Sequence, residues 1–249
     1  MTWLDRPGAA AALLTVLLLA LWQAVFMLAG PLAIASPAST LAYMAQQLAG
    51  PDFWVHIWAT GQAFLIALLI AVVGGLAIGL AAGLSATASE TAEPLLLAAN
   101  SIPKIALYPV VLLLFGIGLP AKVAFGAIHG IIPVAIFTIN ACRAIPPVLL
   151  KTGRVMKLSP ADRVRRILLP AALPDIVTGV RLGFSLTLIG TILGEMFGSQ
   201  SGLGYLLMTS IGLQNTQVIM AVTVLLIVFA ATVSTALLAW ERSLRERRG

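Results

Sequence analysis

Apolar residues fall into six long stretches, separated by shorter polar segments. Each stretch approaches or exceeds the roughly 20 apolar residues that a helix needs to cross the hydrocarbon core of a bilayer. The apolar runs are continuous rather than alternating, which favours helices over a membrane β-barrel because helices satisfy their own backbone groups. We therefore predict an all-α integral membrane protein with six transmembrane helices. The stretches cover residues 9–30, 60–84, 93–116, 121–141, 173–194 and 217–240.

The composition supports a membrane protein built as one unit. Hydrophobic residues make up 60% of the 249 residues, charged residues only 10%, and the mean hydropathy is +1.03, all outside the range of an ordinary soluble domain. We predict one transmembrane domain over residues 1–249, with a core at 60–240 and an N-terminal helix and extracytoplasmic loop at 1–59. The first stretch follows Arg6 and precedes an Ala-Ile-Ala tract, as a secretory signal would, but its apolar core exceeds the 7 to 15 residues typical of signals. A retained helix is favoured.

The distribution of Lys and Arg predicts the orientation. These residues are absent from 31–59 and 195–216 but dense in 143–181 and 242–248. Because cytoplasmic loops carry the excess of basic residues, the two dense regions should be cytoplasmic, and six spans then place both termini inside. The same rule accounts for the net charge of +6 without a nucleic-acid partner.

Basic residues concentrate in positions 143–166, which we call the basic segment. Apolar side chains at 148, 149, 155 and 156 share one face of a short amphipathic helix, and Lys151, Arg154 and Lys157 share another. Ser159, Pro160 and Asp162 then supply a helix N-cap, a first-turn proline and a capping acid, which predicts a second short helix. The two short helices are expected to meet at a sharp corner, and Pro170 and Pro174 are expected to turn the chain back into the fifth span. The pattern predicts a docking element; a membrane anchor that binds anionic lipid is the alternative.

The third stretch carries the residues expected to line a pathway. Pro103 and Pro109 interrupt it, and proline frees backbone polar groups where a helix borders a cavity. Asn100 and Ser101 lie beside the first proline, with Lys104, whose charge is costly at that depth. A kink required only by packing is the alternative.

Small and isolated residues indicate packing rather than chemistry. Gly75, Gly79 and Gly83 recur every fourth residue, which predicts close helix packing. Cys142 has no partner for an intramolecular disulfide and is expected to pack. His56 and His129 each stand alone, without the spacing of a metal site or a catalytic triad. No enzymatic activity and no metal are therefore expected.

Several tracts together resemble the permease subunits of ATP-binding-cassette (ABC) importers, in particular the nitrate, sulfonate and taurine group. They run in the family's order over about residues 60–240. The tracts are Asn100-Ser101-Ile102-Pro103, Phe115-Gly116-Ile117-Gly118, Leu168-Leu169-Pro170-Ala171-Ala172-Leu173-Pro174, Thr178-Gly179-Val180-Arg181, Gly194-Glu195-Met196 and Ser201-Gly202-Leu203-Gly204-Tyr205-Leu206.

The resemblance implies a type I (MetI-like) importer fold, with a cytoplasmic coupling helix between helices 4 and 5 that enters a cleft of the ATPase subunit. In the family this loop usually carries Glu-Ala-Ala followed by a glycine. Those positions are Lys151, Thr152, Gly153 and Lys157, so a base replaces the acid. Either the ATPase has a complementary acidic cleft, or a second permease keeps the usual motif. The residues expected to dock are Leu150, Lys151, Thr152, Gly153, Arg154, Met156, Lys157, Leu158, Ser159 and Pro160.

The resemblance also implies the function and the partners. The chain would be a multi-pass subunit of a bacterial inner membrane, assembled with two ATPase subunits and a second permease, usually a copy of itself. An extracytoplasmic binding protein would deliver the solute. The chain lacks the Gly-Lys-Ser/Thr phosphate loop, so ATP and Mg would be bound by the ATPase and no cofactor by this chain.

Glu195 matches the family's glutamate at the outer end of the fifth span, and we interpret it as part of the external gate or access route. Simple solvation of a lone acid is the alternative. The Lys104 charge favours a small organic anion as the solute. A secondary transporter or channel working without ATP is disfavoured, because it would place ionisable residues within spans and only Lys104 and Arg181 qualify. The expected pathway and gate residues are Asn100, Ser101, Lys104, Tyr108 and Glu195.

Overall fold

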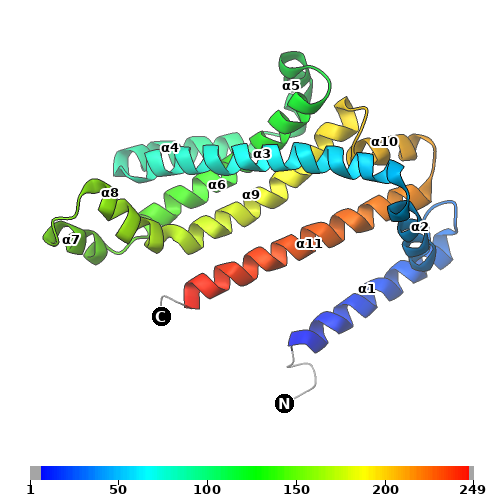
Figure 1. The fold of residues 1–249 in the computed structure, drawn as a ribbon, viewed down its shortest axis with the longest axis horizontal. Coiled ribbons are helices and arrows are strands. Elements are labelled where there is room, and N and C mark those ends of the chain that lie inside the picture. The colour runs from blue at the N-terminus through cyan, green and yellow to red at the C-terminus, as the bar shows by residue number, and fades with distance from the viewer. Residues whose placement is uncertain (1–6, 247–249) are drawn as a thin grey trace.

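The computed structural model describes residues 7–246, apart from the side chains of Pro7, Leu150, Arg154, Pro160 and Ala161. This part of the chain contains helices and no strand (Figure 1). Four single helices and the continuous helical stretch Val164–Gly198 are long and apolar enough to cross a membrane, and the bent pair formed by α4 with η2 and α5 makes a sixth span. The all-α, six-span prediction is therefore confirmed when the bent pair counts as one span. The elements are α1 (Pro7–Ala29), α2 (Pro37–Ala49), α3 (Pro51–Gly83), α4 (Ala86–Ser101), η2 (Lys104–Leu107), α5 (Tyr108–Phe115), α6 (Leu119–Arg143), α7 (Pro147–Val155), α8 (Pro160–Arg163), η3 (Val164–Leu168), α9 (Leu169–Gly198), α10 (Leu203–Gly212) and α11 (Thr216–Glu246).

Helix α6 packs between α3 and α9. On its α3 side, the three predicted glycines face Val134, Thr138 and Cys142 in turn. A methyl group on Gly75 would lie 2.5 Å from Cβ of Val134, and one on Gly83 would lie 2.8 Å from Cβ of Cys142. No larger residue fits, so the predicted close packing is confirmed and Cys142 serves as a small packing residue.

Glycines of α9 allow an equally close approach on the other side of α6. A methyl group on Gly190 would lie 2.8 Å from Cγ of His129. The His129 ring lies in this interface, with Nδ1 2.8 Å from the carbonyl oxygen of Phe125. His129 is thus held inside the packing of α6 against α9.

The third span is broken where Pro103 predicted an interruption. Ile102 is extended, with ψ of 131°, as the residue before a proline prefers. Helix α4 and the η2–α5 pair meet at 81°. Pro109 lies in the first turn of α5, where its missing N–H costs nothing. The expected start at residue 93 was wrong, because α4 begins at Ala86 and contains Pro94.

The end of the basic segment differs from the prediction. Ser159 caps α8 as expected: the Asp162 N–H donates to Ser159 Oγ at 3.1 Å, and this hydroxyl donates to the Asp162 carboxylate at 2.8 Å. However, α8, η3 and α9 follow one another without a break. The Leu169 N–H donates to the carbonyl of Val164, five residues back, and this wider π turn leaves room for the Pro170 ring. The interruption expected at Pro170 and Pro174 is therefore absent, because the chain stays helical through both prolines.

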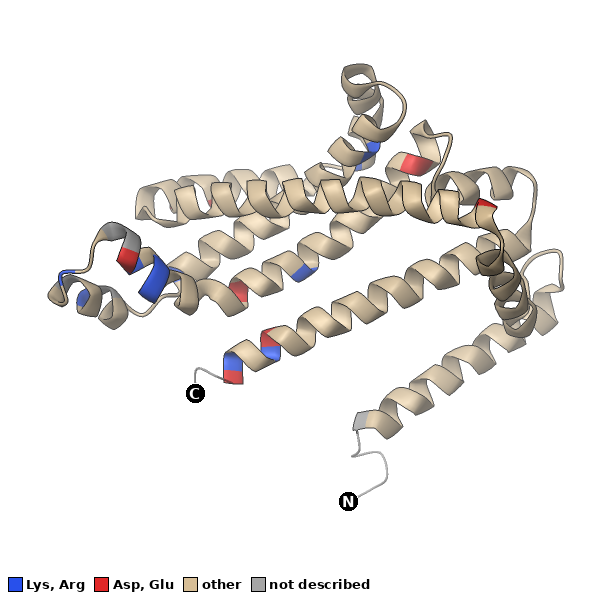
Figure 2. Ribbon diagram, in the orientation of Figure 1, with Lys and Arg blue, Asp and Glu red and all other residues tan. Residues whose placement is uncertain are grey.

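Charged residues gather at one end of the helices, around α7, α8 and the last turns of α11 (Figure 2). The C-terminal end of α11 is attached to α9 by ion pairs. Glu241 is buried and lies 3.4 Å from Arg181 Nε and 3.3 Å from Arg245, which also pairs with Asp175 at 3.0 Å. Arg181 therefore joins two helices and is not an unpaired charge within a span.

Candidate functional site

A buried polar cluster lies at the end of the helices opposite α7, the end that the distribution of basic residues predicts to be outside. Its centre is the Glu195 carboxylate near the end of α9, which is fully buried. Thr60 Oγ1 of α3 donates to Oε2 at 2.7 Å and the Gly204 N–H of α10 donates to the same oxygen at 3.0 Å. Lys122 Nζ of α6 lies 3.3 Å from Oε1. Four helices therefore meet at one carboxylate.

Lys122 is the cation of this cluster and is only 4% exposed. Its Nζ also donates to the carbonyl oxygen of Ser201 at 3.1 Å. Gly194 brings α9 close enough for this pairing, since a methyl group there would lie 3.0 Å from the Lys122 Cα. Both charges are removed from solvent, so each depends on the other and on the surrounding hydrogen bonds. We call Thr60, Lys122, Glu195, Ser201 and Gly204 the outer cluster.

The turn between α9 and α10 is built around the same carboxylate. Gly202 has φ of +119°, and a side chain there would overlap the carboxyl group of Glu195. Its N–H donates to His56 Nδ1 at 3.1 Å, and the Leu203 N–H donates to Thr60 Oγ1 at 2.7 Å. The first N–H groups of α10 thus find acceptors on α3 and α9. His56 is half-buried, and its ring accepts this hydrogen bond from the turn.

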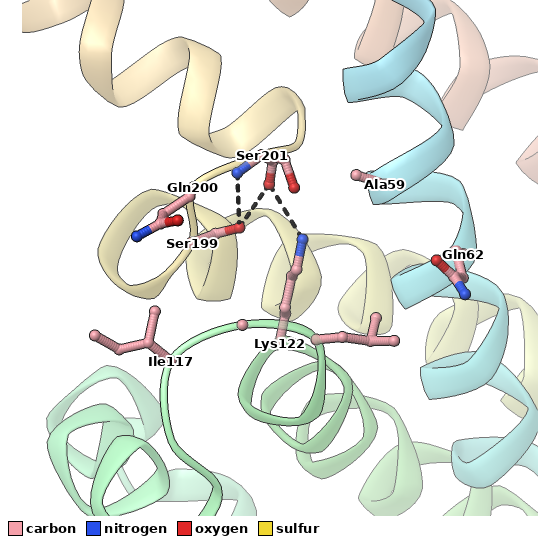
Figure 3. A pocket seen from close by; sticks show the side chains of 9 residues that line it. Ala59, Gln62, Ile117, Lys122, Ser199, Gln200 and Ser201 are labelled. Carbon is pink, nitrogen blue, oxygen red and sulfur yellow. Dashed lines mark hydrogen bonds between the residues drawn. The ribbon is translucent and has the colours of Figure 1, made fainter.

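A cavity of about 470 Å³ borders the outer cluster (Figure 3). The Lys122 side chain points from α6 towards the Ser201 carbonyl at its wall. The lining residues come from α3, from the turn before α6, from the first turn of α6 and from the turn after α9. They are Ala59, Gln62, Ile117, Gly118, Leu119, Lys122, Ser199, Gln200 and Ser201.

The five expected pathway residues lie in two places. Tyr108 lies beside the end of α9, where its hydroxyl donates to the Gly194 carbonyl at 2.6 Å, next to Glu195. Asn100, Ser101 and Lys104 lie instead at the break between α4 and η2. There Lys104 Nζ donates to the Asn100 carbonyl at 3.2 Å and to its side-chain oxygen at 3.1 Å.

Sequence reasoning missed Lys122, Thr60 and His56. Lys122 could have been found, because it is a lone cation inside a predicted span, and such a charge calls for a partner of opposite sign at the same depth. The segments predicted to be outside contain two acids, Asp52 and Glu195, and Glu195 lies directly at the end of a predicted span. Thr60 and His56 carried no comparable signal, because their partners are backbone groups more than 130 residues away or the carboxylate itself.

The basic segment is exposed, in contrast to the outer cluster. Lys151, Thr152 and Met156 face solvent, whereas Gly153 is buried, and a methyl group on it would lie 2.8 Å from Cδ1 of Ile167. The Leu158 N–H donates to the Gly153 carbonyl at 3.1 Å, which closes α7 with a Schellman turn. Lys157 takes the left-handed position of that turn, with φ of +50°.

The remaining docking residues complete this picture. Leu158 is half-buried, and the exposed Ser159 caps α8. The expected side chains of Leu150, Arg154 and Pro160 lie outside the described residues, although their backbone is helical. Lys157 stands where the resemblance places the glycine of the family's motif. It is also the residue with the left-handed backbone.

A broken span, a short exposed helix on the charged side and a buried polar cluster on the opposite side define a polytopic transport subunit. Comparison with known sequences gives its family. The profile of the binding-protein-dependent transport system inner membrane component matches residues 74–248, and the chain belongs to this family. It is a multi-pass membrane permease subunit of an ABC importer, and the resemblance inferred from the sequence is confirmed.

Two relatives match almost the whole chain. The riboflavin transport system permease protein RibX of Chloroflexus aurantiacus is 35% identical over 248 residues, covering 96% of this chain and 92% of the relative. The taurine transport system permease protein TauC of Escherichia coli is 27% identical, covering 95% and 88%.

Solved structures share the fold. An inward-facing MetNI methionine ABC transporter matches with a TM-score of 0.65 at 23% identity, over 78% of this chain and 98% of that one. An amino acid ABC transporter matches with a TM-score of 0.60 at 20% identity, over 76% and 94%. The predicted MetI-like fold is confirmed.

Proposed function

We propose that two copies of this subunit, together with two ATPase subunits, carry a small organic solute that an extracytoplasmic binding protein delivers. The observation that supports this proposal most strongly is the similarity to RibX along 96% of the chain. A second relative of near-full length, TauC, is also named for a small organic solute.

The basic segment is the proposed docking site for the ATPase. Lys151 and Lys157 are exposed and have no acidic partner among the described residues, so their charges are available to an acidic cleft. ATP hydrolysis can drive transport only if the ATPase interacts differently with this segment in two states of the permease. The charges of the segment are therefore part of the coupling.

Reversal of these charges tests the docking site. In proteoliposomes containing the full complex, Lys151→Glu with Lys157→Glu should abolish ATP-driven uptake, because the new carboxylates repel an acidic cleft. The midpoint of thermal unfolding should stay the same. Arg242→Glu, an exposed charge on α11 outside the segment, is the control and should transport normally. Full uptake by the double variant would rule out the docking site.

A single helical path connects the basic segment to the outer cluster. Residues 160–198 are helical without an intervening loop, through α8, the π turn η3 and α9. A displacement of α8 by the ATPase would therefore reach Glu195 without crossing a loop. On this basis the outer cluster is the proposed external gate.

The charge of Glu195 is the feature to test. Glu195→Gln keeps an oxygen for Thr60 and Gly204 but removes the negative charge that faces Lys122. Uptake by the complex should fall, while ATP hydrolysis in the absence of solute should rise because the outer end no longer closes firmly. Glu90→Gln, an exposed acid on α4, is the control. Normal transport by Glu195→Gln would exclude a gate at this position.

The charge of the solute stays a prediction. Lys104 has no acidic partner among the described residues and bonds only to Asn100, which leaves its charge available to an anion. A ligand screen of the co-purifying binding protein would identify the solute. If the solute is an anion, Lys104→Gln should lower its uptake, whereas Arg242→Gln, at an exposed position of α11 outside the basic segment, should not.

A further inference from the structure

The cavity beside the outer cluster has polar residues in its wall, and Glu195 balances the charge of Lys122 there. Lys122 is the charged side chain that lines it, and the ammonium group is already bound to the Glu195 carboxylate and the Ser201 carbonyl. An additional anion here would be repelled by the buried Glu195, and an additional cation by Lys122. The cavity therefore suits an uncharged group.

Two side-chain amides offer unused hydrogen bonds to this cavity. Gln62 comes from α3 and Gln200 from the turn after α9, and in Figure 3 they lie on either side of Lys122. Both are exposed, and neither has a hydrogen-bond partner among the described residues. Each amide presents two donor hydrogens and an acceptor oxygen. A group that both donates and accepts can satisfy both of them.

We propose that this cavity is a recognition subsite for an uncharged part of the transported solute that donates and accepts hydrogen bonds, such as an imide, an amide or a hydroxylated chain. A volume of about 470 Å³ lies within the roughly 300–1,000 Å³ of small-molecule sites. An acidic group on the same solute would have to bind elsewhere, since no free cation lines the cavity. The inference rests on the proposed importer function and specifies the chemistry of its solute.

The subsite is connected to the proposed gate through the α9–α10 turn. Gln200 lies between Ser199 and Ser201, and Ser199 Oγ donates to the Ser201 carbonyl at 2.6 Å. That carbonyl is also the acceptor for Lys122. A solute that binds Gln200 and moves it therefore also moves the Ser201 carbonyl away from the Lys122 ammonium. Binding in the cavity thereby weakens the contacts that close the outer end.

Uptake by the complete complex tests the subsite. Proteoliposomes with this subunit, its ATPase and its binding protein are given riboflavin, whose uncharged ring carries an imide, and taurine, which is charged and has no such group. We expect uptake of riboflavin in preference to taurine. Gln62→Leu with Gln200→Leu should raise the riboflavin KM about tenfold, because roughly two hydrogen bonds are lost and each accounts for a factor of about two to ten. Gln217→Leu, an exposed amide of α11 away from this cavity, should leave KM unchanged.

The readouts separate this inference from the proposed function. ATP hydrolysis that the binding protein stimulates tests the importer assembly alone, and its absence from the wild-type complex would overturn the proposed function. If hydrolysis is stimulated but taurine is preferred, or neither probe is carried, the subsite is wrong. An unchanged riboflavin KM in the double variant would also overturn it. So would a loss of affinity for the binding protein alone, because the cavity would then be a protein contact.

Discussion

The lysines of the outer cluster and of the basic segment lie in opposite environments. At the outer end, Lys122 and Glu195 are 4% and 0% exposed and are bonded to each other and to their surroundings. At the opposite end, Lys151 and Lys157 are exposed and without an acidic partner among the described residues. Buried charges require partners within the protein, whereas exposed ones are satisfied by water. The charges of the outer cluster are therefore satisfied within the chain, whereas Lys151 and Lys157 remain available to solvent or to a partner.

Removal of one cation at each end is expected to give the largest difference in folding stability between the two ends. Lys122→Met leaves the Glu195 carboxylate buried without its cation, so the free energy of unfolding should fall by about 3–5 kcal/mol. Lys151→Met, at an exposed position, should change it by less than about 0.5 kcal/mol. Thermal or denaturant unfolding in detergent measures both variants.

A compensating change checks the cause of this loss. Lys122→Met combined with Glu195→Leu removes both charges and keeps similar volumes, and replacement of a buried ion pair in this way is often neutral. The double variant should therefore recover much of the stability. Equal losses in Lys122→Met and Lys151→Met would contradict the contrast between the two ends.

Replacement of a glycine by alanine should also destabilise the protein more in the α9–α10 turn than in the basic segment. Gly202→Ala forces a side chain into a φ of +119° and against the Glu195 carboxyl, with a cost of roughly 1–3 kcal/mol from the backbone alone. In Gly153→Ala the new methyl group meets the flexible end of Ile167, and the gain in helix propensity of about 1 kcal/mol offsets that contact.

Unfolding of the two alanine variants under identical conditions measures this difference. Gly202→Ala should have the lower free energy of unfolding, and it should also weaken the closure of the outer end in an ATP hydrolysis assay without solute. A Gly153→Ala variant that is the less stable of the two would show that the basic segment is packed as tightly as the outer cluster.

Sequence reasoning succeeded where a feature is local or periodic. The spacing of Gly75, Gly79 and Gly83 predicted close helix packing, though not that α6 is the partner, and Pro103 predicted the break after α4. Both signals come from neighbours within one helix. It was wrong at Pro170, where a single wider turn accommodates a proline that was expected to end the helix.

The outer cluster could be predicted only in part. Glu195 was selected through a family resemblance, but its pairing with Lys122 joins residues 73 positions apart in the chain. Its bond to Thr60 joins residues 135 positions apart. Such contacts depend on how α3, α6 and α9 pack, which hydropathy and local spacing do not determine. The sequence contained both charges, but the packing of the helices decides that they meet.

Substitution of Lys157 is expected to have the smallest effect on stability. It separates the contribution of the backbone conformation from that of the charge in the basic segment. Lys157 has φ of +50°, a conformation that costs a residue with a Cβ roughly 1–2 kcal/mol relative to the right-handed helix. Glycine adopts it freely but loses more chain entropy on folding. Lys157→Gly should therefore raise the free energy of unfolding by up to about 1 kcal/mol, whereas Lys157→Ala, which removes the charge but keeps the Cβ, should not. Both variants should bind the ATPase less tightly than the wild type if the charge contributes to docking, so the glycine variant would be more stable and less well coupled at once. Equal stability of the two variants would mean that Lys157 does not strain the turn. The charge at this position would then be present without any loss of folding stability.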